Sequence, residues 1–162
     1  MRILVTGGAG MIGSNLVRDL VQTGITTTVV DNLWRGRLEN LILATEGIVT
    51  LDGIFFQYDL RDYERCLEVT KGVDIVVHLA DIVAGINFVF SNELFLFRAN
   101  SQINSNILSA AIENRVEQFL YVGTACSYPQ DKQASICTIP LRECDAYPAN
   151  PESSYGWSKL MG

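Results

Sequence analysis

Residues 6–13 read TGGAGMIG and stand between two segments of different hydrophobic pattern. The segment before them, RILVTG (2–7), is a short apolar run that ends in glycine, which predicts a buried strand. The segment after them, MIGSNLVRDLVQTG (11–24), carries apolar residues at helical spacing, and Gly24 stands where a helix C-terminal cap belongs. A strand, a glycine-rich turn and a helix in this order predict the opening unit of an α/β fold.

The rest of the chain repeats this alternation of strands and helices. We expect strands over 26–32, within 53–62, and over 73–80 and 117–124, and helices over 63–72 and around 100–115. Residues 35–47 are expected to form a short helix or a loop, and VEQFLYV (116–122) has the pattern of a buried strand. The alternation favours parallel pairing, so we predict a doubly wound, mostly parallel α/β sheet of the Rossmann type. The segment from Ser127 to Ser154 lacks periodicity and is expected to be a long, functional loop.

Composition argues against several classes of protein. The chain has 162 residues, enough for one domain with a real core, and its net charge is −6. Its Lys and Arg residues are scattered, which argues against nucleic-acid binding and against a basic membrane-binding patch. Four cysteines without C-x-x-C spacing and a single histidine argue against a metal site. The most apolar stretch, 82–97, is too short and polar to span a bilayer, and the chain enters a strand at once, so we expect a cytoplasmic protein with reduced thiols.

The glycine spacing predicts a dinucleotide-binding turn. Gly7 would allow the tight turn, Gly10 the close approach of the backbone to a pyrophosphate, and Gly13 close packing of the helix. The N–H groups at the start of the helix, which include those of Met11 and Ile12, would then face the phosphates. A glycine triplet is weak evidence by itself, because an ordinary glycine-rich turn has the same composition.

A carboxylate at the end of the second expected strand supports the same interpretation. Asp31 lies 18 residues after Gly13, where it would accept hydrogen bonds from an adenosine ribose, and its neighbour Asn32 would lie beside the same part of the cofactor. This arrangement favours NAD. Arg35 and Arg37 are close enough in sequence to meet a 2′-phosphate, so NADP is a minor alternative, and a solvated Asp beside an ordinary turn is another.

The spacing TGxxGxxG resembles the glycine motif of the extended short-chain dehydrogenase/reductase family. YDLRD (58–62) looks like that family's Asp-Leu pair beside the adenine, which implies that Asp59 and Leu60 contact the cofactor. VVHLAD (76–81) is similar to the end of the family's fourth strand, which implies that the backbone passes the cofactor at Leu79 and Ala80.

Three residues near these motifs have no predicted catalytic role. His78 is interpreted as structural, since no partner for a catalytic histidine can be identified in the sequence. Asn100 stands at a helix position that the family also keeps, and we interpret it as structural support. Asp81 departs from the family's usual HLAA ending, and the sequence offers no explanation for it.

SSYGWSK (153–159) contributes Tyr155 and Lys159, which helical spacing places on one face. A tyrosine with a free pKa of about 10 is a poor base, but a nearby ammonium and a positive nicotinamide both favour the phenolate. The resemblance implies that Tyr155 transfers a proton and that Lys159 holds the nicotinamide ribose. It also implies that Thr124, after the fifth strand, hydrogen-bonds the substrate oxygen, although a hydroxyl that only caps the strand end is the alternative.

GTACSYPQ (123–130) places Cys126 two residues after Thr124. A small thiol of this kind is commonly a packing residue. However, GTACSYPQDKQ and the later PLRECDAYPANPESSYGWSKL resemble the nucleotide-sugar epimerase branch of the family, and most closely the 3,5-epimerases of GDP-linked sugars. This resemblance implies that Cys126 is catalytic. It also implies that Ala84, Gly85, Thr124, Ala125 and Cys126 contact the substrate.

Other segments resemble other branches of the family. DNLWRG (31–36) is more like the 4-epimerases and decarboxylases. The 4,6-dehydratases carry an Asp-Glu pair where this chain has Ala125 and Cys126, which argues against that reaction.

The resemblance implies a reaction without net redox change. C4 of a nucleotide-linked hexose would lose hydride to NAD while Tyr155 takes the hydroxyl proton, which makes the hydrogens at C3 and C5 acidic. Cys126 and a lysine from a later part of the enzyme would then exchange those protons before the ketone is reduced again.

The family also has a C-terminal substrate domain and is usually dimeric. We therefore expect residues 1–162 to be an NAD-binding Rossmann domain, truncated before the substrate domain and inactive by itself, from a homodimeric enzyme that acts on a nucleotide sugar. The alternatives are another member of the family, such as a UDP-sugar 4-epimerase, a decarboxylase or a 4-reductase, and a non-catalytic NAD-binding module.

Overall fold

The computed structural model describes residues 1–45, 53–134 and 140–162, which divide into two compact units. Unit 1 consists of Met1–Asp81 and Ser105–Val122. Unit 2 consists of Ile82–Asn104 and Gly123–Gly162. The assignment of residues 1–162 to a single NAD-binding domain stays a prediction.

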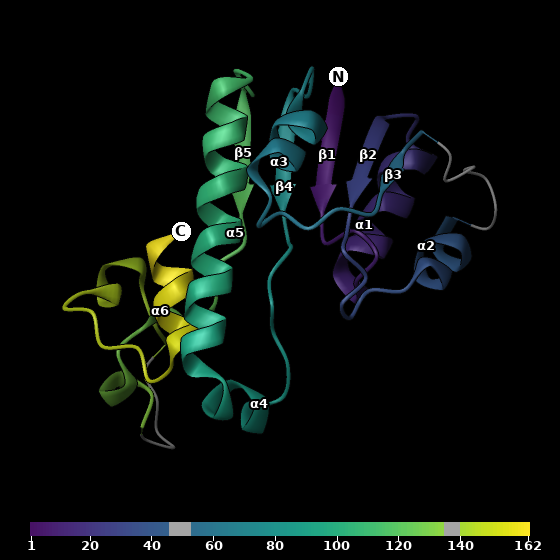
Figure 1. Ribbon diagram of the computed structural model, residues 1–162. Coiled ribbons are helices and arrows are strands. Elements are labelled where there is room, and N and C mark those ends of the chain that lie inside the picture. The colour runs from purple at the N-terminus through teal and green to yellow at the C-terminus, as the bar shows by residue number, and fades with distance from the viewer. Residues whose placement is uncertain (46–52, 135–139) are drawn as a thin grey trace. The chain divides into compact units, whose positions relative to one another are not determined.

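Unit 1 is built on a parallel sheet of five strands (Figure 1). They are β1 (Arg2–Thr6), β2 (Thr26–Val30), β3 (Phe55–Phe56), β4 (Ile75–His78) and β5 (Gln118–Tyr121). Their order in the sheet is β3-β2-β1-β4-β5, and every neighbouring pair is parallel. The chain moves outward from β1 to β3 and then crosses to β4 and β5 on the other side of β1. The sheet is therefore doubly wound, as the sequence predicted.

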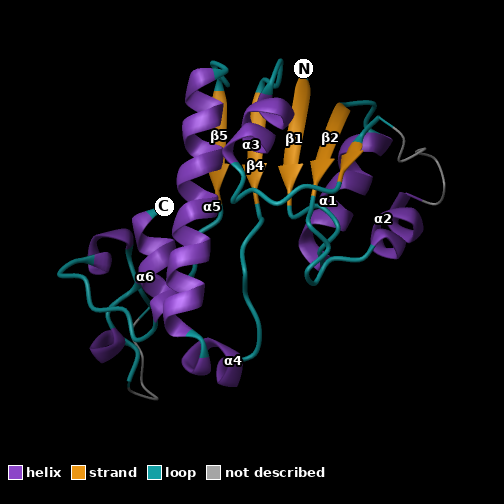
Figure 2. Cartoon of the chain, in the orientation of Figure 1, coloured by secondary structure: helices purple, strands orange, loops and turns teal. Residues whose placement is uncertain are grey.

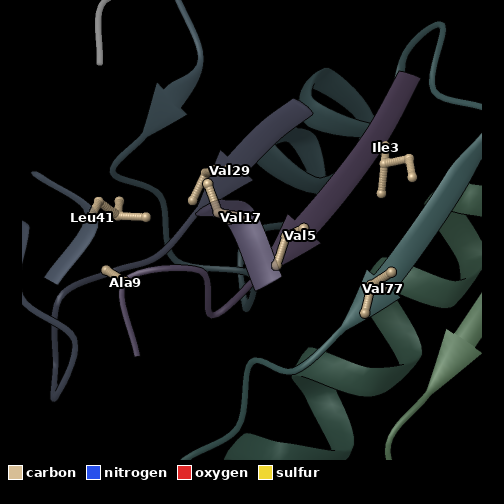
Figure 3. Close-up of a cluster of buried hydrophobic side chains, with 7 residues drawn as sticks. All are labelled: Ile3, Val5, Ala9, Val17, Val29, Leu41 and Val77. Atoms are coloured by element: carbon tan, nitrogen blue, oxygen red, sulfur yellow. The ribbon is translucent and has the colours of Figure 1, made fainter. Parts of the chain in front are cut away.

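Helices cover both faces of this sheet (Figure 2). Unit 1 contains α1 (Met11–Gln22), α2 (Leu38–Thr45), α3 (Tyr63–Thr70) and the C-terminal part of α5 (Glu93–Glu113). Because strand side chains alternate between the faces, Ile3 and Val5 point to one face and Leu4 to the other, and all three are buried. Figure 3 shows the cluster on the first face, which consists of Ile3, Val5, Ala9, Val17, Val29, Leu41 and Val77.

The register of the central strands aligns their carboxyl ends. Thr6, the last residue of β1, is paired with Val30 on one side and with His78 on the other. The segments that follow these three strands, beginning at Gly7, Asp31 and Leu79, therefore leave the sheet at one edge. Ligands of open α/β sheets bind at this edge, where the strand order reverses.

One prediction about unit 1 needs correction. The run 116–122 does not form a buried strand: β5 is an edge strand of the described sheet, and its Leu120 side chain is 57% exposed. Apolar composition alone cannot distinguish an edge strand from a central one. The third strand lies within 53–62, as predicted, and consists of Phe55–Phe56. α1 ends at Gln22, so Gly24 follows directly after its C-terminal cap, Thr23, close to the predicted position.

Unit 2 contains α4 (Ile86–Ser91), the N-terminal part of α5 and α6 (Ser154–Met161). The long helix begins at Glu93 rather than near residue 100, and α4 was not predicted, because the apolar run 82–97 shows no clear helical period. In the described part of 127–154, the expected loop contains only short 3₁₀ turns: η1 (Ala125–Ser127) at its start, then η2 (Gln130–Lys132) and η3 (Glu143–Ala146).

Asn100 holds the start of unit 2 in place. Its side chain is fully buried, its Oδ1 accepts the N–H of Ile82 at 2.8 Å, and its Nδ2 donates to the carbonyl of Ile82 at 3.0 Å. One amide thus satisfies both backbone groups of a residue outside regular structure. This is the structural role that the sequence suggested.

Candidate functional site

The glycine-rich turn of unit 1 has no room for side chains at two of its motif positions. Gly7 has a left-handed backbone (φ 66°), and a Cβ there would lie 2.8 Å from the amide nitrogen of Ala80. A Cβ on Gly13 would overlap the carbonyl oxygen of Gly7 and lie 2.6 Å from the Cα of Gly8. Gly10 is less confined, because the nearest atom to its Cβ would be the Gly7 oxygen at 3.2 Å. The turn is therefore packed most tightly at Gly7 and Gly13 and less tightly at Gly10.

The start of α1 can bind an anion. Its N-cap is Gly10, and among the described residues no side chain caps its first N–H groups. Met11 is 81% exposed and Ile12 63% exposed, so two apolar side chains lie at the surface beside those groups. Uncapped N–H groups and the helix dipole favour a phosphate at this position.

Asp31 lies directly after β2 and ties the glycine turn to the segment that follows the strand. Its carboxylate accepts the N–H of Ala9 at 3.0 Å and that of Leu33 at 2.8 Å. Burial raises the pKa of the Asp31 carboxyl above its ordinary value, and the two N–H groups, Leu33 first, act in the opposite direction. Each carboxylate oxygen has a further acceptor site, so these bonds leave capacity for a ribose hydroxyl.

The structure brings Asn32 and Asp59 together. The Asn32 amide donates to the Asp59 carboxylate at 3.4 Å, and the Arg61 guanidinium donates to the same carboxylate at 2.6 Å. The hydrogen bond from Arg61 lowers the pKa of the Asp59 carboxyl, and burial opposes this effect. Leu60 is buried, and its carbonyl accepts a hydrogen bond from the Cys66 thiol at 3.2 Å.

The segment after β4 is held by Thr6, a residue that the motif analysis missed. The Thr6 hydroxyl accepts the N–H groups of Leu79 at 3.1 Å and Ala80 at 3.0 Å. It therefore donates its own hydrogen to Nδ1 of His78, which lies 2.7 Å away and is fully buried. His78 acts here as a structural acceptor, consistent with its interpretation from the sequence.

In unit 2, Thr124 caps the single turn that carries Cys126. The Thr124 hydroxyl accepts the N–H of Cys126 at 3.3 Å, which is the capping role weighed as the alternative to catalysis. A hydroxyl that accepts one hydrogen bond keeps its own hydrogen for donation, so capping and substrate binding are compatible. Ala125 and Cys126 are exposed.

α6 positions Tyr155 and Lys159. It begins after Ser153, whose hydroxyl accepts the N–H of Gly156 at 3.2 Å. Tyr155 lies in the first turn and is half-buried, whereas Lys159, one turn later, is only 7% exposed. The spacing of four residues places both on one side of the helix.

A cavity of about 640 Å³ in unit 2 brings Cys126 and Tyr155 together. Ala84, expected to contact the substrate, lies in its wall, while Gly85 is the N-cap of α4 and is not a wall residue. Thr124, Ala125 and Lys159 are not wall residues either. The other wall residues are Val83, Ile86, Val89, Phe90, Gln130, Asp131, Gln133, Ala134, Glu152 and Ser153.

Most of these wall residues were missed by the sequence analysis. Except for Ala134, the apolar ones come from α4 and the segment before it, and the signal for them was the large share of apolar residues between 82 and 90.

In unit 1, the sequence analysis also missed Gly8: a Cβ there would overlap the side chain of Val29. Cys137 lies outside the described residues.

The structure also bears on metal binding and on membrane-spanning helices. No group of three or more His, Cys, Asp or Glu side chains in 1–45, 53–134 and 140–162 is arranged to hold a metal ion. Over the same residues, no helix has both the length and the apolarity needed to cross a bilayer.

The sequence of this chain is similar to those of NAD-dependent epimerases. A model of the NAD dependent epimerase/dehydratase family matches residues 3–162. GDP-mannose 3,5-epimerase of Arabidopsis thaliana is 36% identical over 160 residues, which are 99% of this chain and 40% of that protein. UDP-glucose 4-epimerase of Lacticaseibacillus casei is 31% identical over 99% of this chain and 44% of its own length.

A solved structure gives the same result. The UDP-glucose 4-epimerase of Thermus thermophilus, determined in complex with NAD, superimposes with a TM-score of 0.79 at 31% identity. The match covers 99% of this chain and 48% of that one. The chain therefore spans less than half the length of each of these relatives.

Proposed function

The chain belongs to the NAD dependent epimerase/dehydratase family, and from this premise we propose that it is the NAD-binding part of a nucleotide-sugar epimerase. The reaction we favour is epimerisation of GDP-mannose at C3 and C5. The observation that carries this choice is that Cys126 and Tyr155 line one cavity. Transient oxidation at C4 needs only the tyrosine, whereas proton exchange at the neighbouring carbons needs a second acid–base group such as a thiol.

The residues of unit 1 fit a dinucleotide. The turn has no side chain at Gly10, where the phosphates would require approach of the backbone, and the first N–H groups of α1 have no side-chain cap. Asp31 retains acceptor capacity for the adenosine ribose, which favours NAD over NADP. Asn32, Asp59, Leu60, Leu79 and Ala80 are proposed to line the rest of the cofactor.

NAD, when bound, supplies a hydride acceptor and, once reduced, a hydride donor. Tyr155 is proposed to accept the proton of the C4 hydroxyl, and the Lys159 ammonium to favour the phenolate and hold the ribose of the nicotinamide. Thr124 is proposed to donate its hydroxyl hydrogen to the same sugar oxygen, because its bond with the N–H of Cys126 uses only one lone pair and leaves that hydrogen available.

Cys126 is proposed to move the carbon-bound protons. A ketone at C4 makes the hydrogens at C3 and C5 acidic, and the exposed thiol of Cys126 lies in the cavity wall. Inversion requires a second acid–base group on the opposite face of the sugar. We place that group in the part of the relatives that this chain does not match.

A second candidate is a UDP-sugar 4-epimerase. The UDP-glucose 4-epimerases among the relatives and the DNLWRG segment (31–36) favour it. This reaction inverts only C4 by hydride transfer, so it would leave the protons at C3 and C5 in place. Cys126 would then be a packing residue.

Titration calorimetry tests the cofactor assignment on the chain as it stands. We expect NAD+ to bind, and NADP+ to bind about ten-fold more weakly, because Asp31 would repel the 2′-phosphate. Absence of binding by either dinucleotide would refute every version of the proposal.

Solvent deuterium tests the reaction. The chain, expressed with any coding sequence that continues beyond residue 162, is incubated in D₂O with NAD+ and either GDP-mannose or UDP-glucose. Deuterium at C3 and C5 of recovered GDP-mannose supports the 3,5-epimerase, whereas UDP-galactose free of deuterium supports the 4-epimerase. The variant Cys126→Ser should abolish deuterium uptake and leave NAD+ affinity unchanged.

We also propose that the protein acts as a homodimer. Ile112, on α5 in unit 1, is 70% exposed and offers apolar surface to a second copy of the chain. Analytical ultracentrifugation checks this expectation, and a monomer at micromolar concentration would refute it.

A further inference from the structure

Cys126 lies in a segment that cannot hold its own conformation. It is the central residue of η1, a single 3₁₀ turn that follows the end of β5. A single turn fixes several backbone dihedrals for very few hydrogen bonds, so isolated turns of this kind are unstable in water. The thiol can act at a fixed place in the cavity only if other parts of unit 2 restrain the turn.

Gln133 supplies one restraint. Its side-chain nitrogen donates to the carbonyl of Ala125 at 3.2 Å and to the carbonyl of Tyr128 at 3.1 Å. These two carbonyls lie on either side of Cys126, and the two hydrogens of one amide therefore clamp the turn. Gln133 is also a wall residue of the cavity that Cys126 lines.

Gly156 supplies the second restraint. A Cβ at this position would overlap the carbonyl oxygen of Cys126 and lie 2.9 Å from the Cβ of Pro151. The first turn of α6 therefore packs directly against the backbone of Cys126, at the residue that follows Tyr155. The lack of a side chain at Gly156 allows the backbone of Cys126 to approach the first turn of α6 this closely.

We propose that Gln133 and Gly156 are positioning residues that hold Cys126 in register with Tyr155 in the cavity of unit 2. The inference rests on the proposed function, because register matters only if both side chains serve one substrate. Neither residue touches the reacting atoms in this scheme. Gln133 restrains the turn of the thiol, and Gly156 restrains the distance between the turn and α6.

The variant Gln133→Glu tests the clamp with little change in size. It replaces the amide nitrogen, which donates both hydrogen bonds, by a carboxylate oxygen that faces the same two carbonyl oxygens. We expect amide hydrogen exchange of Ser127 and Tyr128, whose N–H groups close the turn, to become about ten-fold faster. We expect deuterium uptake at C3 and C5 to fall about ten-fold or more, while hydride transfer from C4 changes by less than about three-fold. A merely structural role would lower both rates together.

The variant Gly156→Ala tests the register. Its new methyl group meets the Cys126 carbonyl, so the turn and α6 must separate; deuterium uptake, which needs both Cys126 and Tyr155 in place, should fall about ten-fold or more, and hydride transfer, which does not use Cys126, should change by less than about three-fold. Gly123→Ala is the matched control, because no atom lies within 4 Å of a Cβ there. Gln118→Glu, on the exposed side of β5, is the control for Gln133→Glu. Thermal unfolding establishes that each variant is folded.

The outcomes separate the inference from the proposed function. If the parent protein takes up deuterium and Gln133→Glu and Gly156→Ala do so at the same rate, the inference is wrong and the proposed function stands. If the parent protein takes up none, the proposed function is wrong, and amide exchange decides the restraint. Faster exchange at Ser127 and Tyr128 in Gln133→Glu but not in Gln118→Glu then supports the clamp, and equal exchange overturns it.

Discussion

The thiols of Cys66 and Cys126 have opposite surroundings. Cys66 is fully buried and its thiol donates to the carbonyl of Leu60. Burial raises the pKa of the Cys66 thiol to about 12, with the charges of Asp62 and Asp59 acting in the same direction. Cys126 is exposed in the cavity wall of unit 2. Because the thiolate is the reactive species, only one of these two thiols is suited to chemistry.

We therefore predict selective alkylation. At pH of about 8, a thiol with a pKa of about 12 is ionised in about one molecule in ten thousand, so Cys66 should stay unmodified while Cys126 reacts. Cys144 is also exposed and should react, which makes it an internal reference. Peptide mass spectrometry after treatment with iodoacetamide measures each site, with urea-unfolded protein as the control. If Cys66 in the folded protein were modified as fast as Cys126, the prediction that the Cys66 thiol is protected would be wrong.

Asp31 gives a prediction for the pH dependence of cofactor binding. Burial raises the pKa of this carboxyl above its value of 3.8, so the folded protein takes up this proton at a higher pH than the unfolded chain does. Protonated Asp31 therefore contributes to the free energy of unfolding fully below pH 3.8, and this contribution is lost as the pH rises through the pKa of the folded state. The carboxylate needed for ribose binding is present above the folded pKa and is lost as the pH falls through it.

NAD+ affinity should therefore decrease on acidification at a pH above that of an ordinary Asp. The variant Asp31→Asn should bind NAD+ about ten-fold more weakly at neutral pH and lose this pH dependence. Titration calorimetry at a series of pH values measures both effects. Equal pH profiles for the parent protein and Asp31→Asn would show that another group controls binding.

At the scale of elements, two glycines of the turn between β1 and α1 have different roles. Gly13 allows close packing of the backbone, and Gly10 is where a ligand would approach. A Cβ on Gly13 would meet the backbone of Gly7 and Gly8, whereas a Cβ on Gly10 would meet only one oxygen at 3.2 Å. The first position determines how α1 packs on the sheet. The second, Gly10, has no side chain at the place where a pyrophosphate is proposed to approach the backbone.

Alanine at each position should have a different effect. Gly13→Ala should lower the free energy of unfolding by about 2–3 kcal/mol, because backbone must move to admit the methyl group. Gly10→Ala should lower it by less than about 1 kcal/mol, since the φ of −76° at Gly10 suits any residue. Urea unfolding measures these values. Both variants should reduce NAD+ affinity, and a Gly10→Ala variant with full affinity would show that no phosphate lies against that residue.

At the scale of the whole molecule, each of the two compact units contributes a different part of the proposed chemistry. Unit 1 carries the glycine turn, Asp31 and the segment after β4. Unit 2 carries Cys126, Tyr155 and Lys159, with the cavity between α4 and α6. Binding of NAD+ to the chain should therefore change measurable properties of residues in each unit.

Hydrogen exchange tests this division. NAD+ should slow amide exchange at residues 7–13 in unit 1, and also in the first turns of α6 if Lys159 holds the nicotinamide ribose. Mass spectrometry of peptic peptides with and without NAD+ measures both regions. Protection confined to unit 1 would exclude Tyr155 and Lys159 as cofactor ligands, and no protection at 7–13 would exclude the glycine turn.

Much of unit 1 could be predicted from local pattern. The order of strands and helices, the doubly wound sheet and the cramped glycine positions follow from hydrophobic period and from steric limits on the backbone. Two features of this unit could not be predicted. The exposure of Leu120 depends on which strand is at the edge of the sheet, and the bond between Thr6 and His78 joins residues that are neighbours only through strand pairing.

The sequence by itself therefore determined the α/β fold, the dinucleotide-type turn and the spacing of Tyr155 and Lys159, because each depends on interactions between residues close in the chain. Only the tertiary structure decided that Cys126 and Tyr155 share a cavity and that Gln133 and Gly156 restrain the thiol. These contacts belong to an irregular segment. A side-chain amide that bonds to distant carbonyls leaves no periodic pattern in the sequence, so its partners are known only once the backbone is in place.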